Sequence, residues 1–80
     1  MCIKEAIVLR FKEICSERKI KFNELATMSG VTPSTVYSMM DNRRKDISVN
    51  TVKKLCDGLE ISIMDYFNSP IFEKLEQEIQ

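Results

Sequence analysis

The chain has 80 residues, 44% of them hydrophobic and 30% charged, which is enough for one helical globular domain and too little for a cofactor domain beside a substrate domain. Its formal net charge of zero is divided unevenly, because residues 1–54 hold eleven Lys and Arg against six acids, whereas residues 55–80 hold one Lys against six acids. This division predicts a cationic working face and an acidic end directed away from it, with two merely solvated surfaces as the alternative.

Residue types that catalysis and metal binding require are scarce. Histidine is absent and no phosphate-binding or dinucleotide-binding glycine motif occurs, so we expect no enzyme, no cofactor and no metal. The three cysteines, Cys2, Cys15 and Cys56, form neither a disulfide framework nor a CxxC pair, and we expect the last two to be small buried side chains. No apolar run is long enough to span a membrane and no signal-peptide pattern is present, so the expected location is the cytoplasm.

The first helix is predicted over residues 3–18, where apolar residues recur at helical spacing: Ile7, Phe11, Ile14 and Cys15. A second, short helix is predicted over residues 22–29. It should end at Gly30, since glycine readily adopts the left-handed conformation that closes a helix.

The third helix should begin with Thr32 as its N-cap and Pro33 at its first position, where the missing N–H of proline removes no hydrogen bond. Val36, Met39 and Met40 form its buried side, and it should end near Asp41. Asn42 would then turn the chain in a positive-φ conformation.

The fourth helix is predicted from Val49 to about Leu59, with Ser48 as its N-cap. Ser62 and Asp65 resemble a capping box, which predicts a fifth helix over residues 63–67. After a break at Ser69 and Pro70, an apolar stripe predicts a sixth, amphipathic helix. The stripe consists of Ile71, Phe72, Leu75 and Ile79.

Two short helices joined by a glycine-containing turn are typical of the helix-turn-helix motif. The segments FNELATMSGVTPSTVYSMMDN (residues 22–42) and ISVNTVKKLCDGLEISIMDYF (residues 47–67) resemble the Cro and phage-repressor type of helix-turn-helix domain, also called Xre-like. The similarity covers roughly residues 5–67. It implies an all-α fold, with a five-helix repressor-like DNA-binding domain over residues 1–68 and an added C-terminal amphipathic helix over residues 69–80.

Several positions depart from the family pattern. Phe22 stands where the family usually has a Gln that holds a DNA phosphate. Cys15 and Met40 replace a buried Arg–Glu ion pair, and exchanging both partners for apolar groups avoids stranding one charge. Asn42 replaces the usual Gly after the recognition helix, and Ile47 replaces the usual Pro before the fourth helix.

The resemblance implies a sequence-specific transcriptional regulator of bacterial or phage type, such as a repressor, that binds double-stranded DNA as a homodimer. Small polar residues on a helix surface can reach base edges in the major groove. The expected base-reading residues are Pro33, Ser34, Tyr37 and Ser38. A Tyr37 ring lying over the neighbouring helix with its hydroxyl in water is the alternative for that residue. The expected DNA-backbone residues are Lys21, Thr32, Thr35, Arg43, Arg44 and Lys45.

The apolar stripe Ile71, Phe72, Leu75 and Ile79 is the predicted dimer interface, and folding of this segment onto its own core is the alternative. The sequence suggests no membrane partner and no small-molecule ligand. A second class of function is open: a protein-interaction module, antitoxin-like or an adaptor, could use the same fold with weak or no DNA binding. The modest serine-based reading face and the missing Gln favour it, whereas the cationic first part opposes it.

Overall fold

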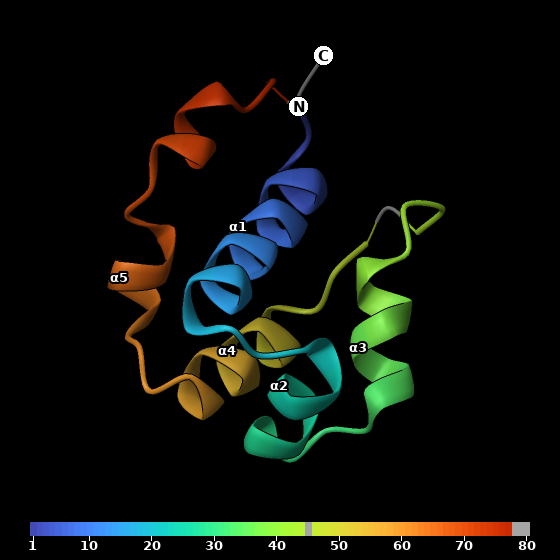
Figure 1. Ribbon diagram of the computed structural model, residues 1–80. Helices are drawn as coiled ribbons and strands as arrows, with labels where there is room; N and C mark the ends of the chain where they lie inside the picture. Colours follow the sequence, from blue (N-terminus) through green and yellow to red (C-terminus); the bar gives the residue numbers. More distant parts are fainter. Residues whose placement is uncertain (45, 78–80) are drawn as a thin grey trace.

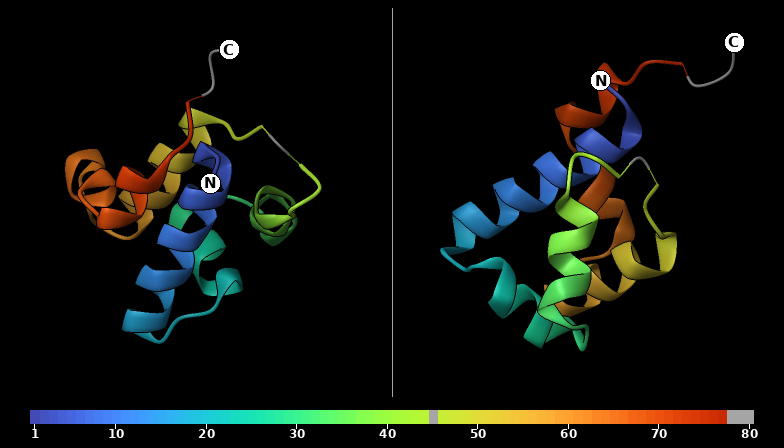
Figure 2. Two further views of the ribbon diagram at one scale, coloured as in Figure 1. Left: turned by 90° about the horizontal axis from the view of Figure 1, so that it is seen from above. Right: turned by 90° about the vertical axis from the view of Figure 1, so that its right-hand side faces the viewer.

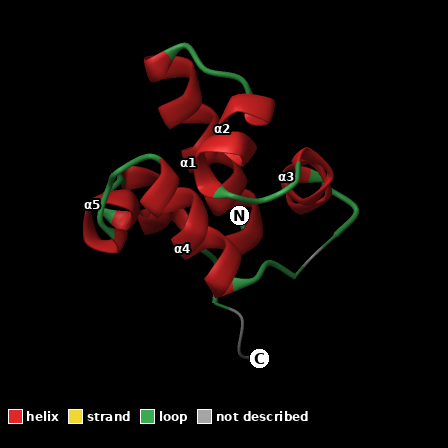
Figure 3. Ribbon diagram, turned by 90° about the horizontal axis from the view of Figure 1, so that it is seen from below, coloured by secondary structure: helices red, strands yellow, loops and turns green. Residues whose placement is uncertain are grey.

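The computed structural model of the protein describes residues 1–44 and 46–77. Its helices, in chain order, are α1 (Ile3–Arg18), α2 (Phe22–Ser29), α3 (Pro33–Met40), α4 (Val49–Gly58), α5 (Ile63–Phe67) and the short 3-10 helix η1 (Pro70–Lys74) (Figure 1). The described residues contain no strand, as Figure 3 shows. The prediction of an all-α, five-helix domain is therefore confirmed, and the bounds of α1 to α5 agree with those predicted to within about one residue.

Local signals in the sequence set the helix ends. The hydroxyls of Thr32, Ser48 and Ser62 accept hydrogen bonds from the backbone N–H groups of Thr35, Thr51 and Asp65, so each caps a helix as predicted. Gly30 closes α2 with φ of 70°, which a residue with a side chain adopts only with strain. These caps explain why the helix bounds could be read from the sequence.

The prediction that Asn42 turns the chain with a positive φ is wrong. Among the described residues other than glycine, only Lys19 and Glu60 have a positive φ. Asp41 instead leaves α3 in an extended conformation with φ of −67° and ψ of 122°, and its backbone carbonyl accepts from Arg44 N at 3.1 Å. Residues 41–44 therefore turn the chain without a left-handed residue.

One core holds the helices together. Its fully buried members come from all five α-helices: Ala6, Phe11, Leu25, Ala26, Val36, Leu55, Cys56, Leu59 and Tyr66. Cys15 is buried in the same core and Met40 packs against it, as expected for apolar substitutes of an ion pair. A direct contact between these two side chains stays a prediction.

Three basic side chains of α1 reach the C-terminal ends of three other helices. The Lys4 ammonium, 4% exposed, donates to the carbonyl of Asp41 at the end of α3. Arg18 Nη1 donates to Leu59 O at the end of α4, at 2.6 Å. Arg10 donates from Nε to Tyr66 O at 2.7 Å and from Nη2 to Asp65 O at 3.1 Å, both in α5. The last carbonyls of a helix lack intrahelical partners and carry partial negative charge, so these cations stabilise the assembly of α1 with its neighbours.

The predicted C-terminal amphipathic helix is shorter than expected. Among the described residues of this segment, 69–77, only Pro70–Lys74 is helical, in the 3-10 form, and residues 75–77 follow without helical structure. Phe72 packs against the rings of Tyr66 and Phe67, with centroid distances of 5.9 and 4.8 Å, so its side chain is used within the chain.

The end of the described chain is also joined to its start. The N-terminal ammonium of Met1 donates to Glu76 Oε1 at 2.8 Å, and Glu76 N donates to Met1 O at 3.0 Å. These two bonds place the residues after η1 beside the start of α1 (Figure 1). The structure thus supports the fold-back alternative for this segment.

Candidate nucleic-acid interface

Helix α3 lies at the edge of the molecule, across α1 from α5 and η1, and is exposed along its length (Figures 1 and 2). Its buried side consists of Val36 and Met39. The opposite side presents Ser34, Thr35 and Tyr37, with Ser38 half-buried beside them. An exposed helix with small polar side chains can enter a major groove about 12 Å wide. The η1 segment, which carries one acid and one base, Glu73 and Lys74, lies across α1 from this helix, so the acidic end directed away from it stays a prediction.

Three hydroxyl groups are linked at the start of α3. Thr32 Oγ1 lies 2.8 Å from Thr35 Oγ1 and 3.2 Å from Ser34 Oγ, and it accepts from Thr35 N at 3.3 Å. Thr32 therefore acts mainly as the N-cap. The Ser34 and Thr35 hydroxyls are exposed and can rotate to donate to, or accept from, a DNA group.

Tyr37 lies partly over α2. Its ring meets the ring of Phe22 edge-on, with centroids 6.1 Å apart and an interplanar angle of 71°, and the residue is 52% exposed. Phe22, which stands at the usual Gln position, is thus used for packing. This geometry matches the alternative given for Tyr37 and still leaves half of the side chain exposed.

The loop after α3 contains a tight ion pair. Arg43 Nε donates to Asp41 Oδ1 and Oδ2 at 3.1 and 3.2 Å, and its Nη2 donates to Oδ2 at 2.8 Å. The Arg43 guanidinium and its backbone N–H hold the pKa of the Asp41 carboxyl well below its ordinary value, so this carboxylate is ionised at neutral pH. Sequence reasoning missed Asp41. An Asp two residues before an Arg, at the end of a helix, was the available signal.

Arg44 and Lys45 are the other two predicted DNA-backbone residues of this loop. Arg44 is exposed, and within residues 1–44 and 46–77 its guanidinium has no ion-pair partner. Lys45 lies outside the described residues. The charge of Arg44 is therefore not neutralised by any acidic group in the described part of the chain.

The start of α2 is occupied by a carboxylate. Lys21 is exposed, and its backbone N–H donates to Glu24 Oε1 at 3.2 Å. Glu24 already satisfies one donor at this helix end and brings a negative charge to it. A phosphate bound by Lys21 would have to approach beside that charge.

The cationic face predicted from the charge count is smaller in the structure. Lys4, Arg10 and Arg18 cap other helices, and Lys53 pairs with Asp57 one turn along α4. These four cations are directed to protein groups. The charge available to a polyanion consequently depends on fewer residues, with Arg44 among them.

Two apolar surfaces are candidates for protein contact. The residues Ile71 and Leu75 of the predicted stripe are half-buried, and Ile79 lies outside the described residues. Elsewhere, Val49 is 79% exposed and Met64 is 83% exposed. Val49 borders an apolar groove of about 260 Å³ between α4 and α5, together with Ile47, Ile63 and Phe67.

The cysteines are reduced side chains in the structure, and Cys15 and Cys56 are buried as predicted. Burial raises the pKa of the Cys56 thiol to about 11 and also raises that of Cys15, so neither is activated as a nucleophile at neutral pH. No helix in the described part of the chain is long and apolar enough to cross a membrane.

Comparison with known proteins agrees with this geometry. The sequence profile of the Cro/C1-type HTH DNA-binding domain matches residues 10–68, which is more than half of the chain. A solved structure, the crystal structure of the prophage Lp1 protein 11, is similar with a TM-score of 0.80 and 29% sequence identity, and the match covers 94% of this chain and 100% of that one. No curated protein matches the sequence.

Proposed function

This chain belongs to the Cro/C1-type helix-turn-helix DNA-binding domain family, and on that basis we propose that it is a sequence-specific transcriptional regulator of bacterial or phage type. The observation that carries the proposal is the exposed polar side of α3, with Ser34, Tyr37 and Ser38 on it, at the edge of the molecule. Because its partner would be the DNA of a bacterium or phage, we place the protein in the cytoplasm. The proposed activity is binding, with no catalytic step.

In this proposal α3 enters the major groove, and its side chains divide into two groups. Pro33, Ser34, Tyr37 and Ser38 face base edges, where Pro33 offers only an apolar contact, as to a thymine methyl. The remaining residues contact phosphates, which carry the same charge at every sequence and so fix position rather than specificity. These are Lys21, Thr32, Thr35, Arg43, Arg44 and Lys45.

The experiment that tests the function is selection of bound duplexes from a random pool, followed by binding measurements on the enriched site. We expect Arg44→Ala to weaken binding to all duplexes alike and to lower the slope of log K against log salt by roughly 0.9 per lost phosphate contact. Ser38→Ala should cost about 1 kcal/mol on the enriched site, relax preference at one base position and leave the slope unchanged.

Lys74→Ala is the matched control, because it removes the same charge from η1, across α1 from the recognition helix. Its slope should equal that of the unmodified chain. If no motif is enriched, or if Arg44→Ala and Ser38→Ala reduce binding identically at every sequence, the reading surface is refuted.

The alternative is a protein-interaction module on the same fold. Two observations favour it: four cations of the first part of the chain are directed to protein groups, and the apolar side chains of Val49 and Met64 are each exposed. An antitoxin-like protein or an adaptor would need an exposed apolar surface and little DNA contact. Failure of the selection experiment would favour this function.

We further propose that the protein acts as a homodimer, because two-fold pairing would set two copies of α3 about one DNA turn apart, ~34 Å. The predicted interface is the C-terminal stripe, of which Ile71 and Leu75 keep part of their surface exposed. Leu75→Glu should then raise the dimer Kd at least tenfold, by placing a charge in an apolar contact. Sedimentation equilibrium measures this directly.

Met64→Glu is the matched variant, since it places the same charge on the other apolar surface. If Met64→Glu dissociates the dimer and Leu75→Glu does not, the interface includes Met64 instead of the C-terminal stripe. A chain that is monomeric at the concentrations where it binds DNA would exclude the homodimer.

A further inference from the structure

The Asp41 carboxylate binds both the backbone N–H and the guanidinium of Arg43, two residues further along the chain. Asp41 Oδ1 accepts from Arg43 N at 2.9 Å, and the two carboxylate oxygens accept from Nε and Nη2 of the guanidinium. A single carboxylate thus sets the backbone turn and the direction of the Arg43 side chain together. Isolated surface arginines sample many rotamers, so this degree of ordering at an exposed position needs a reason.

The pair leaves one edge of the guanidinium available. Nε and Nη2 point at Asp41, while Nη1 has no acceptor within the described residues. The Arg43 side chain is 87% exposed, whereas that of Asp41 is 26% exposed, so the guanidinium is the more accessible partner of the pair. The outer edge, formed by Nη1 and the second N–H of Nη2, has the forked geometry that binds two oxygens of an anion.

The position of the pair relative to α3 is fixed from the other side. The carbonyl of Asp41 accepts from the buried ammonium of Lys4 and from Arg44 N, and Asp41 N donates to Ser38 O at 3.2 Å. The pair is therefore tied to the last turn of α3 and to α1. An arginine held in this way keeps its outer edge at a defined place beside the proposed recognition helix.

We propose that Asp41 is a positioning residue for DNA-backbone binding: it orders Arg43 before DNA arrives, so that the outer edge of the guanidinium meets a phosphate beside the end of α3. The proposal rests on the DNA-binding function proposed above. Ordering in the unbound protein reduces the entropy that binding has to remove, which strengthens the Arg43 contact. The negative charge of Asp41 acts in the opposite direction, since it repels the same phosphate.

Because these two effects oppose each other, Asp41→Asn alone does not separate them, and a double-mutant cycle with Arg43→Ala does. An Asn at this position keeps an oxygen for Arg43 N and loses the ion pair. We expect Arg43→Ala to raise the Kd for a mixed-sequence DNA duplex about fivefold when Asp41 is present and less than twofold in the Asp41→Asn background. A purely structural role for Asp41 would change the melting temperature and leave this ratio the same in both backgrounds.

Asp46→Asn is the matched control, since it removes one negative charge from the same loop, and the structure records no bond between Asp46 and Arg43. In that background Arg43→Ala should keep its full effect. An equal or larger effect of Arg43→Ala in the Asp41→Asn background overturns the positioning role while the DNA-binding function stands. If the unmodified chain binds no duplex, the function and the positioning role fail together.

Discussion

Replacing Tyr66 with alanine is expected to lower the free energy of unfolding by about 4 kcal/mol, a large part of the 5–15 kcal/mol typical of a small domain. The ring is fully buried and lies against those of Phe11, Phe67 and Phe72, with centroid distances of 4.7, 4.9 and 5.9 Å. The guanidinium carbon of Arg10 lies 5.9 Å from the ring centroid. Truncation would leave a cavity between α1, α5 and η1, because these elements meet at this one side chain.

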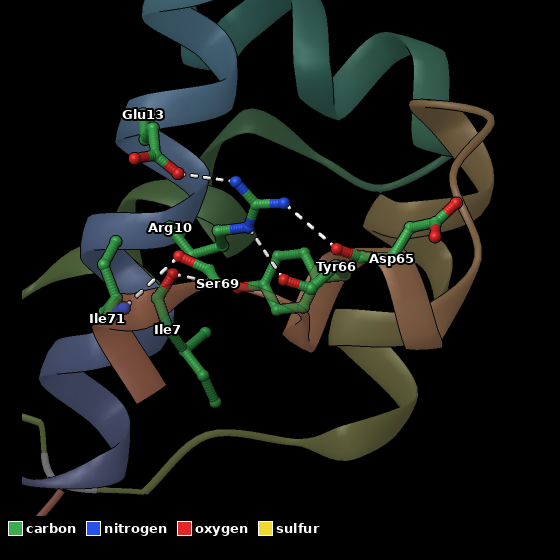
Figure 4. Close-up of polar contacts among 7 residues, drawn as sticks. All are labelled: Ile7, Arg10, Glu13, Asp65, Tyr66, Ser69 and Ile71. Atoms are coloured by element: carbon green, nitrogen blue, oxygen red, sulfur yellow. Dashed lines mark hydrogen bonds and ion pairs between the residues drawn. The ribbon is translucent and has the colours of Figure 1, made fainter. Parts of the chain in front are cut away.

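Tyr66→Phe separates the hydroxyl from the ring. Tyr66 Oη donates to Ile7 O at 3.0 Å, and Figure 4 shows this bond beside those of Arg10 to Asp65 and Tyr66. Loss of the Tyr66–Ile7 hydrogen bond should lower the free energy of unfolding by about 1 kcal/mol. Urea unfolding followed by circular dichroism measures both variants. A Tyr66→Ala chain within about 1 kcal/mol of the unmodified one would show that the aromatic cluster is not the centre of the fold.

The stability of the unmodified chain and that of Tyr66→Phe should depend differently on pH. Burial raises the pKa of Tyr66 far above its ordinary value, so the folded state keeps the phenol neutral while the unfolded state can ionise. The resulting stability is complete below the unfolded pKa of about 10 and is lost as the pH rises above it. Tyr66→Phe should therefore lose less stability than the unmodified chain between neutral pH and strongly alkaline pH. Equal losses in both chains would show that Tyr66 is not the titrating group.

Gly58→Ala is expected to be the second most harmful of these changes, with a loss of about 2 kcal/mol and roughly 10 °C in Tm. A Cβ at Gly58 would lie 2.2 Å from Ser29 Oγ, 2.9 Å from Ser29 Cα and 3.0 Å from the carbonyl carbon of Met28. Two of these atoms are backbone, so α2 and α4 would have to separate. The overpacking should exceed the gain of about 1 kcal/mol that alanine brings to a helix.

Ser29→Ala supplies the control for this contact. Ser29 Oγ is buried with no hydrogen-bond partner among the described residues, so its removal should be neutral or slightly stabilising. In the Ser29→Ala background, Gly58→Ala should cost less, because the 2.2 Å contact disappears while the backbone contacts remain. Thermal unfolding of the unmodified chain, the two single variants and the double variant measures this difference in cost. A Gly58→Ala chain as stable as its parent would mean that α2 and α4 do not approach so closely.

Much of the candidate site was also predictable from the sequence. The turn at Gly30 and the cap at Thr32 place α3 after α2 at helix-turn-helix spacing, and the alternation of Val36 and Met39 with small polar residues predicts which side is exposed. Roles in DNA binding remain predictions for every residue of the site. The Asp41–Arg43 pair spans only two residues, so it too was within reach of sequence reasoning.

The sequence by itself determined α1 to α5 and their order, because helix caps, the left-handed Gly30 and apolar periodicity act over three or four residues. Only the tertiary structure decided which cations form hydrogen bonds within the protein and are therefore not available to DNA. Lys4, Arg10 and Arg18 donate to carbonyls that lie 37 to 56 residues away in the sequence. A count of charges cannot predict which distant groups will be neighbours in the fold. The tertiary structure also decided that Gly58 lets α4 approach the backbone of α2 and that Phe72 packs against Tyr66. Those outcomes depend on which helix surfaces pack together. Apolar burial between helices is non-directional, so no local sequence pattern specifies which surfaces meet.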